Sequence, residues 1–314
     1  MKTRTPLYTP SVSVPDRGYI RTFEAEIDYL EDATMRVHGV QSDYQHRLEY
    51  IWIVRLPNYK ILGASASHLA GEQTVLSPEL LTRCAALQGM CTTQGLTKTV
   101  RSTLGDLPGS QEHLVMTIEM ARVSLQGFPV PKGDHERFAS LAETIPSGPS
   151  RIARMAWERD RAGWPWICNS CYTYRDESVA LFAERQVQCF DLDQISPTPG
   201  QKRFFWRTKQ LRITPFSDGS GYSCHNAMND TFHELDVDLD IEIDGTVRAA
   251  TSQWQRLAFT GLCEDPQTRT PGLTGKKLDK HYARLLADHV GGKSGCSHLF
   301  DLSVDCLRFF QWRE

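Results

Sequence analysis

The sequence predicts an α+β protein of two pseudo-symmetric repeats, each an antiparallel sheet followed by two helices, with a helical and aromatic insert between them. Three observations predict this fold class. One polar pattern occurs in both halves of the chain, each half holds segments with strand-like alternation, and each half ends in segments with helical spacing. These patterns place the first repeat at residues 1–126, the insert at 127–199 and the second repeat at 200–314.

The polar pattern is His-x4-Asp-x2-His. Its copies are His38, Asp43 and His46, and His225, Asp230 and His233. The offset is 187 residues at all three positions (225 − 38, 230 − 43 and 233 − 46). Downstream, the pair His113-Leu114 recurs as His298-Leu299, and upstream Arg21-Thr22 recurs as Arg207-Thr208. Agreement at the flanks as well as in the pattern indicates an internal duplication.

Each repeat then contains a predicted hairpin, in which two runs rich in β-branched and aromatic residues flank a turn. The four runs are Glu49–Arg55, Tyr59–Ala64, Leu235–Ile243 and Thr246–Trp254. Pro57-Asn58 and Asp244-Gly245 provide the turns. The third run alternates strictly between apolar and acidic residues, which is typical of a strand with one wet face. Its carboxylates are therefore expected to face solvent rather than to bind a metal.

Helical spacing follows each hairpin. Leu96–Leu104 and Leu278–Val290 are amphipathic and stop at glycines that suit a helix C-terminus. A last helix begins near Glu112 in the first repeat and near Ser297 in the second. The repeated His113 and His298 then lie in its first turn, where backbone N–H groups and the helix dipole favour a neutral imidazole or a nearby anion.

The insert has loop-like stretches, two helical segments and one aromatic segment. The helical segments are His135–Glu143 and Arg151–Arg161. The aromatic segment contains Trp164, Trp166, Tyr172 and Tyr174. These four rings either pack against the sheets or form a wall for a flat apolar ligand, and we list them as candidate substrate-binding residues.

Composition excludes several classes of protein. With 314 residues, 40% hydrophobic, 23% charged and a net charge of −3, the chain is typical of a globular protein without a nucleic-acid footprint. No secretory signal and no apolar run of the roughly 18–20 residues that span a bilayer is present, so we expect a cytoplasmic protein without a membrane partner. Nine cysteines then favour buried thiols; for Cys168-x-x-Cys171 a structural role is favoured over a metal or redox role.

The repeated polar residues are the candidate catalytic residues. They are His225, Asp230, His233 and His298, and in the first repeat His38, Asp43, His46 and His113. Two imidazoles and a carboxylate supply a general acid, a general base and the group that fixes an imidazole tautomer. They are also a feasible metal-ligand set. Residues 43 and 46, however, point to opposite faces of a strand unless a turn intervenes, so we expect no metal and no other cofactor.

A structural role is the alternative for each of these residues. A duplicated domain repeats the side chains that hold its fold, such as an aspartate that closes a turn. Among the remaining polar residues, Arg21 and Arg207 are candidates to hold a phenolate or carboxylate, and Tyr222 is a candidate to protonate a leaving oxygen.

The C-terminal stretch Gly292-Lys-Ser-Gly-Cys-Ser-His-Leu, with the hairpin after His233-Glu234, resembles a bacterial family, domain-of-unknown-function family 2889. That family carries a Gly-Cys-Thr-His-Leu signature near its end, and the resemblance covers approximately residues 203–312. The first repeat departs from it, since Ser110-Gln-Glu-His113 has glutamine in place of the cysteine. The resemblance implies an architecture and an association with the breakdown of aromatic compounds, but no established reaction.

Together these observations predict an enzyme that acts on a small aromatic, lignin-derived phenolic substrate by cofactor-independent acid/base chemistry. The expected reaction is a lyase-type elimination or ring opening, such as release of formaldehyde, with the second repeat more active than the first. The sequence is also compatible with a homodimer. The alternatives are a metal-dependent hydrolase or isomerase that uses the same residues, and a non-catalytic ligand-binding protein. No phosphate-binding glycine loop or nucleophile elbow is present to favour other classes.

Overall fold

The chain is divided into two compact units. The computed structural model describes residues 8–10, 18–31, 33–44, 46–70, 78–93, 96–105, 110–126, 143–190, 197–308 and 310–312. Unit 1 comprises Met1–Ile20, Arg137–Phe190 and Lys209–Glu314, and unit 2 comprises Arg21–Glu136 and Asp191–Thr208. Both units combine antiparallel strands with helices, so the protein is α+β, as expected.

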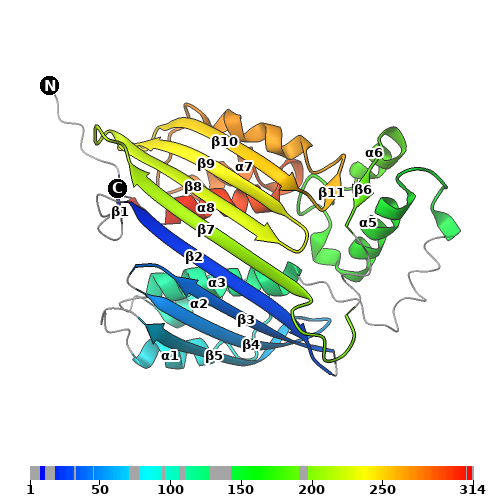
Figure 1. The fold of residues 1–314 in the computed structure, drawn as a ribbon, viewed down its shortest axis with the longest axis horizontal. Coiled ribbons are helices and arrows are strands. Elements are labelled where there is room, and N and C mark those ends of the chain that lie inside the picture. Colours follow the sequence, from blue (N-terminus) through cyan, green and yellow to red (C-terminus); the bar gives the residue numbers. More distant parts are fainter. Residues whose placement is uncertain are drawn as a thin grey trace. The chain divides into compact units, whose positions relative to one another are not determined.

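Unit 2 contains four antiparallel strands in the order β2-β3-β4-β5 (Figure 1). They are β2 (Tyr19–Tyr29, in this unit from Arg21), β3 (Thr34–Ser42), β4 (Arg47–Arg55) and β5 (Lys60–Ala70). Along β4 the buried residues Leu48, Tyr50, Trp52 and Val54 alternate with more exposed ones, which gives the sheet one apolar face.

Three helices of unit 2 follow its strands: α1 (Pro78–Ala85), α2 (Leu96–Leu104) and α3 (Ser110–Gln126). Helix α3 packs on β3 and β4, and α1 packs on β5. Gly39 of β3 permits this close approach, because a Cβ there would meet the Met120 Sδ of α3 at 2.5 Å. Helix α1 is absent from the elements expected from the sequence, although Ser77-Pro78-Glu79 has the serine, proline and glutamate that are typical of a helix start.

Unit 1 contains the strands β7 (Phe205–Pro215, in this unit from Lys209), β8 (Gly221–Asp230), β9 (Glu234–Glu242) and β10 (Val247–Arg256), in that order. In β9 Leu235, Val237, Leu239 and Ile241 are buried and the acidic residues between them are partly exposed. The alternation of Leu235–Ile243 therefore forms the expected strand with one apolar face.

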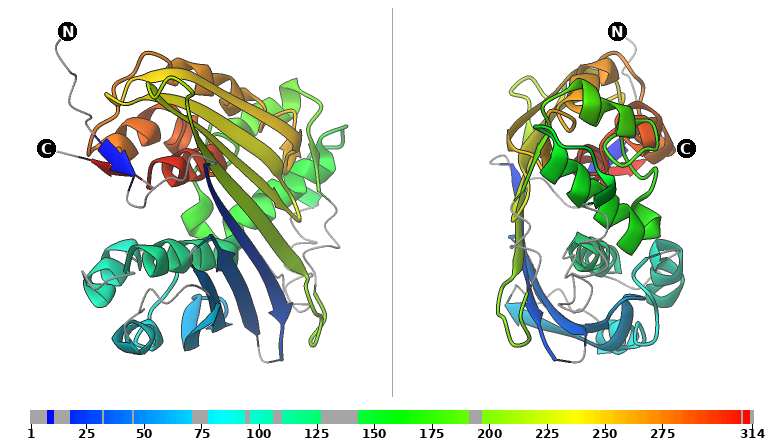
Figure 2. Two further views of the ribbon diagram at one scale, coloured as in Figure 1. Left: turned by 60° about the vertical axis from the view of Figure 1, so that its left-hand side comes forward. Right: turned by 90° about the vertical axis from the view of Figure 1, so that its right-hand side faces the viewer.

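Helical segments follow the strands of unit 1 and lie on one face of them (Figure 2). They are η4 (Asp265–Leu273), α7 (Tyr282–His289), η5 (Gly292–Ser294) and α8 (Ser297–Arg308). Helix α7 is shorter than the expected Leu278–Val290, because the Leu278 N–H donates to the Gly245 carbonyl (2.8 Å) instead of joining a helix. A core of aliphatic side chains fills the space between α7, α8 and the strands.

The insert residues Arg137–Phe190 belong to unit 1. They form α5 (Arg151–Gly163), η2 (Pro165–Ile167), α6 (Ser178–Glu184) and β6 (Gln188–Cys189), which pairs with β11 (Phe259–Thr260). The expected helix His135–Glu143 falls, up to residue 142, outside the described residues. β1 (Tyr8–Pro10) and β12 (Phe310–Trp312) form a separate two-stranded sheet. Among the described residues no helix is both long and apolar enough to cross a membrane.

The hairpins of the two units have the same register. His38 lies opposite Ile51 in the β3–β4 pair, and His225 lies opposite Asp238 in the β8–β9 pair. An offset of 187 converts the first pair into the second (38 + 187 = 225 and 51 + 187 = 238). The β4–β5 and β9–β10 ladders each contain two register shifts as well.

Candidate functional site

The candidate site begins at the turn that joins β8 to β9. The Asp230 N–H donates to the His233 carbonyl (2.7 Å). The Asp230 Oδ1 accepts the backbone N–H groups of Phe232 (2.8 Å) and His233 (2.7 Å). An aspartate that accepts N–H groups two and three residues later closes a tight turn. The turn required to bring this Asp and His together is therefore present, and Asp230 is fully buried in it.

The same carboxylate orients the imidazole of His233. The His233 Nδ1 lies 3.1 Å from the Asp230 Oδ1. A carboxylate oxygen only accepts, so Nδ1 carries the proton and donates it in this bond. The Nε2 of a neutral His233 then offers its lone pair, which is the form that a general base requires. His233 is 7% exposed, so the pair lies largely out of water.

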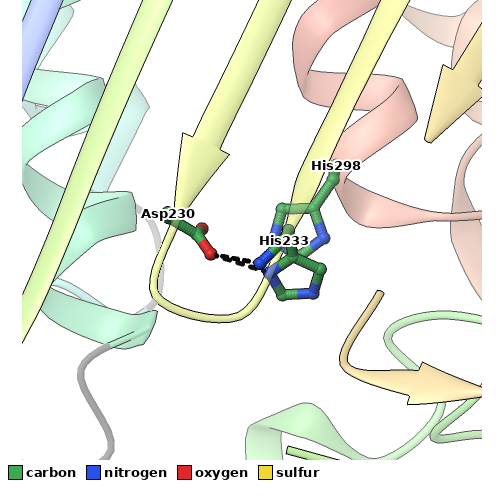
Figure 3. A group of neighbouring side chains, drawn as sticks. All are labelled: Asp230, His233 and His298. Atoms are coloured by element: carbon green, nitrogen blue, oxygen red, sulfur yellow. Dashed lines mark hydrogen bonds and ion pairs between the residues drawn. The ribbon is translucent and has the colours of Figure 1, made fainter. Parts of the chain in front are cut away.

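His298 is the third member of the cluster and comes from the first turn of α8 (Figure 3). Its ring lies against that of His233, with centroids 4.0 Å apart and an interplanar angle of 41°. One ligand-type atom from each of Asp230, His233 and His298 lies within 4.8 Å of the others. The structure thus brings together three of the four residues proposed for the second repeat, and these three could also hold a metal ion.

Helix α8 is held in place by buried polar contacts. The Lys209 Nζ lies 3.3 Å from an Asp301 carboxylate oxygen and also contacts Asp305, one turn further along α8. The Asn226 side chain of β8 donates to the Leu302 carbonyl (3.0 Å). These contacts fix the helix against β7 and β8 and so set the position of His298.

A row of aromatic rings extends from His233 into the insert. Phe232 lies edge-on to His233, Phe190 is 4.5 Å from Phe232, and Phe190 and Tyr174 both contact Phe259. Phe232 and Phe259 are buried in this row, whereas Phe190 and Tyr174 keep part of their surface exposed. Phe190, Phe232 and Phe259 were not singled out in the sequence, because single phenylalanines in separate segments carry no local signal.

The first histidine of each pattern lies apart from this arrangement. The His225 Nδ1 pairs with Asp238 (2.8 Å) on the neighbouring strand, and both side chains are about 40% exposed. His38 pairs with Glu49 in the same way (2.9 Å). The carboxylates of Asp236 and Asp238 form, with His225, a second group that could hold a cation. Neither histidine joins the aspartate and the second histidine of its own pattern.

Unit 2 has a related but different cluster. The His46 N–H and Nδ1 lie 2.7 and 3.3 Å from the Asp43 Oδ1, so the turn is the same as in unit 1. Here, however, His46 lies beside His68 of β5, with ring centroids 6.2 Å apart. A hydrogen bond to Asp43 raises the pKa of His46 and outweighs the opposing effect of burial. His68 is not part of the repeated pattern, because the residue 187 positions later is Gln255. The sequence pattern therefore did not identify His68 as a candidate.

His113 of α3 is enclosed by two other polar groups. Its Nδ1 lies 2.5 Å from the Tyr50 hydroxyl and 3.3 Å from the Cys84 sulfur. Burial, with smaller contributions from His68 and His46, lowers the pKa of His113 to about 4. Burial also raises the pKa of Cys84 to about 11. His113 is therefore a neutral, fully buried ring at neutral pH. Its Nδ1 is in contact with Tyr50 and Cys84.

The candidate substrate-binding residues have diverse surroundings. Trp164 is buried, Trp166 and Arg21 are partly exposed, and Arg207 is 1% exposed with its guanidinium 5.7 Å from the Phe205 ring. The hydroxyl of Tyr172 donates to Asp265 (2.5 Å) and that of Tyr174 to Asp160 (2.6 Å). Of these residues, only Tyr174 is named above in the aromatic row. The hydrogen bonds that the Tyr172 and Tyr174 hydroxyls donate to carboxylates indicate that both side chains have a structural role.

Tyr222 lies far from the cluster. It is near the start of β8 and packs on Phe310, whereas Asp230 is the last residue of the strand. Eight residues of extended chain span roughly 26 Å at about 3.3 Å per residue. Burial raises the pKa of Tyr222 as well. Tyr222 therefore cannot supply a proton at the Asp230 site, which corrects the role expected for it from the sequence.

Comparison with protein families gives a match over the C-terminal part of the chain. The family model for proteins of unknown function DUF2889 matches residues 214–308, which include Asp230, His233 and His298. No curated protein and no solved structure matches the chain. The chain is thus similar to this family over residues 214–308, and the residues before 214 lie outside the match.

Proposed function

We propose that unit 1 is the catalytic unit of an acid/base enzyme, a lyase that acts on a small aromatic substrate without a cofactor. The observation that carries the proposal is the buried pair of Asp230 and His233 in contact with His298. A carboxylate that holds the Nδ1 proton of a histidine leaves Nε2 as a base and stabilises the imidazolium that forms when it takes a proton. The adjoining aromatic row suits an aromatic substrate.

The reaction that we assign is the loss of formaldehyde from a lignin-derived phenolic that carries a hydroxymethyl group next to an aryl ether carbon. His233 Nε2 removes the hydroxyl proton, and the C–O bond becomes the C=O bond of formaldehyde as the C–C bond breaks. The released electron pair forms a C=C bond and expels the aryl oxygen. His298, in place of the distant Tyr222, gives that oxygen a proton. One proton is taken and one is returned, so the step balances without an oxidant.

We also propose that the two units are copies of one domain. Four strands followed by helical segments occur in each, and the β3–β4 and β8–β9 registers are related by the same offset as the histidine pattern. Backbone hydrogen bonds repeat as well: Ile61 to Met90 (2.8 Å) in unit 2 corresponds to Val247 to Lys276 (2.9 Å) in unit 1, with an offset of 186 in both residues (247 − 61 and 276 − 90). Shared bonds of this kind are typical of duplicated folds.

A metal-dependent hydrolase or isomerase is the second candidate. It is favoured by the convergence of ligand atoms from Asp230, His233 and His298 within 4.8 Å. Two imidazoles and a carboxylate suit zinc, iron or manganese. Elemental analysis separates the two candidates: about one equivalent of metal per chain, lost on substitution of His233 or His298, supports the metal-dependent enzyme.

The test uses His233→Gln and His298→Gln, with His225→Gln as the matched control from the exposed side of β8. Phenolic aryl ethers and phenylcoumaran-type dimers that carry a hydroxymethyl group are supplied, and formaldehyde and the phenolic product are measured. We expect both site variants to lose roughly 10²–10⁴ of kcat and the control to keep it. Unchanged activity in both site variants rules out the site. If the wild-type protein binds these phenolic compounds but does not turn them over, the result favours a non-catalytic binding protein.

A further inference from the structure

Three cysteines from three separate segments of unit 1 converge beside the N-terminus of α8. Cys171 lies in the insert, Cys263 lies just before η4, and Cys296 immediately precedes α8. The Tyr172 N–H donates to the Gly295 carbonyl (2.8 Å), which places Cys171 and Cys296 on either side of one backbone bond. The Thr173 hydroxyl lies 3.1 Å from the Cys263 sulfur, which brings the third thiol to the same place.

Backbone N–H groups surround two of the three sulfurs in the same way. Backbone groups of Tyr174 and Thr173 hydrogen-bond to the Cys171 sulfur, and those of Leu299 and His298 to the Cys296 sulfur. In both cases the N–H groups come from residues two and three positions after the cysteine, so two unrelated segments present a sulfur in the same cradle. Hydrogen bonds to a thiolate sulfur stabilise its charge and tune thiolate-bound metal centres.

The three thiols influence one another and one buried amide. Burial raises the pKa of each, to about 11 for Cys296, and the other cysteines add to the rise for Cys263 and Cys296. All three residues nevertheless keep part of their surface accessible. Gln267 is 2% exposed and hydrogen-bonds to Cys296, and its Oε1 is buried without a hydrogen-bond partner. Buried polar oxygens are nearly always paired, so this one is consistent with a ligand bound beside the cysteines.

We infer that Cys171, Cys263 and Cys296 bind a thiophilic metal centre that ties the insert, the start of η4 and the start of α8 together. The centre is structural, so it is compatible with cofactor-independent chemistry at Asp230 and does not depend on that proposal. Cys168 takes no part, since its sulfur is directed to the Arg161 carbonyl (3.8 Å). The Cys168-x-x-Cys171 spacing thus marks one ligand rather than a pair.

Sulfur spacing bears on the type of centre. Tetrahedral zinc with Zn–S bonds of about 2.3 Å holds its sulfurs about 3.8 Å apart. Among the described residues the three thiols are not one of the groups whose ligand atoms all lie within 4.8 Å of one another. A single ion would have to draw the sulfurs together, whereas an iron–sulfur cluster spans more widely spaced thiolates.

The experiment measures binding by the full chain, purified without oxygen, in two arms. One arm adds Co²⁺ as a zinc analogue and records thiolate-to-metal charge-transfer absorption. The other adds iron and sulfide and records cluster absorption with iron and sulfide content. We expect one arm to give about one centre per chain, with a rise in thermal unfolding temperature.

Cys171→Ser, Cys263→Ser and Cys296→Ser should weaken binding at least roughly tenfold and remove the thermal shift, while Cys168→Ala behaves as wild type. Since a serine at a buried site can itself destabilise the fold, binding is compared among those variants that retain the wild-type circular dichroism spectrum. Absence of a sulfur-based signal in both arms overturns the inference. So does a signal that survives the three serine variants or that is lost only in His233→Gln.

Discussion

Asp230 combines a structural and a chemical task in one carboxylate. Its Oδ1 accepts two backbone N–H groups that close the β8–β9 turn and also the Nδ1 proton of His233. Asparagine closes such turns as well as aspartate does, because its side-chain oxygen accepts the same N–H groups. The two tasks can therefore be separated by one substitution.

Asp230→Asn should fold with nearly the wild-type free energy of unfolding and lose about 10²–10⁴ of kcat, with a much smaller change in KM. The physical reason is that the amide retains the turn but no longer carries the charge that stabilises the imidazolium of His233. Urea unfolding and steady-state kinetics check the two parts. Full activity in a folded Asp230→Asn protein would reduce Asp230 to a turn residue.

His113 predicts a pH dependence of stability. Burial lowers its pKa from 6.5 to about 4 in the folded chain, whereas the unfolded chain keeps the ordinary value. Between about pH 6.5 and 4 the unfolded state binds the proton and the folded state does not, so stability falls as pH falls through this window. The loss approaches about 3.5 kcal/mol, the product of the pKa shift of about 2.5 and about 1.4 kcal/mol per pKa unit.

Urea unfolding at a series of pH values measures this slope. In His113→Gln the free energy of unfolding should depend less steeply on pH between about pH 6.5 and 4. The difference in slope corresponds to the uptake of up to one proton, and it does not depend on the absolute stability of the variant. His281→Gln, at an exposed position, serves as the control and should keep the wild-type slope. An equal slope in the wild type and His113→Gln would show that this ring titrates as it does in the unfolded chain.

At the scale of elements, the start of α8 depends on the absence of a side chain at Gly295. A Cβ at this position would collide with the carbonyl oxygens of Val290 and Gly291. Both are backbone atoms, so they cannot move aside cheaply. The glycine before Cys296 in the family-like signature therefore has a packing reason: it lets the chain approach the end of α7 before α8 begins.

Gly295→Ala should lower the free energy of unfolding by about 1–3 kcal/mol, because the new methyl group displaces α8 from the end of α7. The matched control is Gly272→Ala in η4, where a Cβ meets nothing within 4 Å. That variant should stay within roughly 1 kcal/mol of wild type. Denaturant unfolding of both checks the prediction, and equal stability of the two variants would contradict it.

At the scale of the whole molecule, each unit has an aspartate–histidine turn with different neighbours. In unit 1 the His298 ring packs on His233 at 4.0 Å. In unit 2 the His113 ring is engaged by Tyr50 and Cys84, and His46 has His68 beside it instead, with centroids 6.2 Å apart. The two units thus have the same aspartate–histidine turn but different third members.

His233→Gln should therefore lose roughly 100-fold or more of kcat, while His46→Gln should stay within about threefold of wild type. The reason is that the His298 ring packs directly on the carboxylate-bound ring of His233, with centroids 4.0 Å apart, whereas the His68 ring lies 6.2 Å from that of His46. The two variants are measured side by side on the same phenolic substrate, and both should show the wild-type circular dichroism spectrum. Comparable losses in both would assign catalysis to the two units together.

The sequence by itself determined the α+β class, the hairpins and the last helix of each unit, and it left open whether a turn joins each Asp to its His. These are local features: strand alternation, helical spacing and turn residues are set by neighbours along the chain. The strands β2, β3, β7 and β8 and the helix α1 were not predicted, and α7 begins later than predicted because the Leu278 N–H bonds to Gly245.

Only the tertiary structure decided which polar side chains meet. His298 joins Asp230 and His233, whereas His225 pairs with Asp238 and Tyr222 lies at the far end of β8. Likewise, Cys171 lies near Cys263 and Cys296 rather than acting with Cys168. Spacing along the chain cannot fix these contacts, because they depend on strand register and on where α8 packs against the sheet, and both are set by burial of side chains distant in sequence.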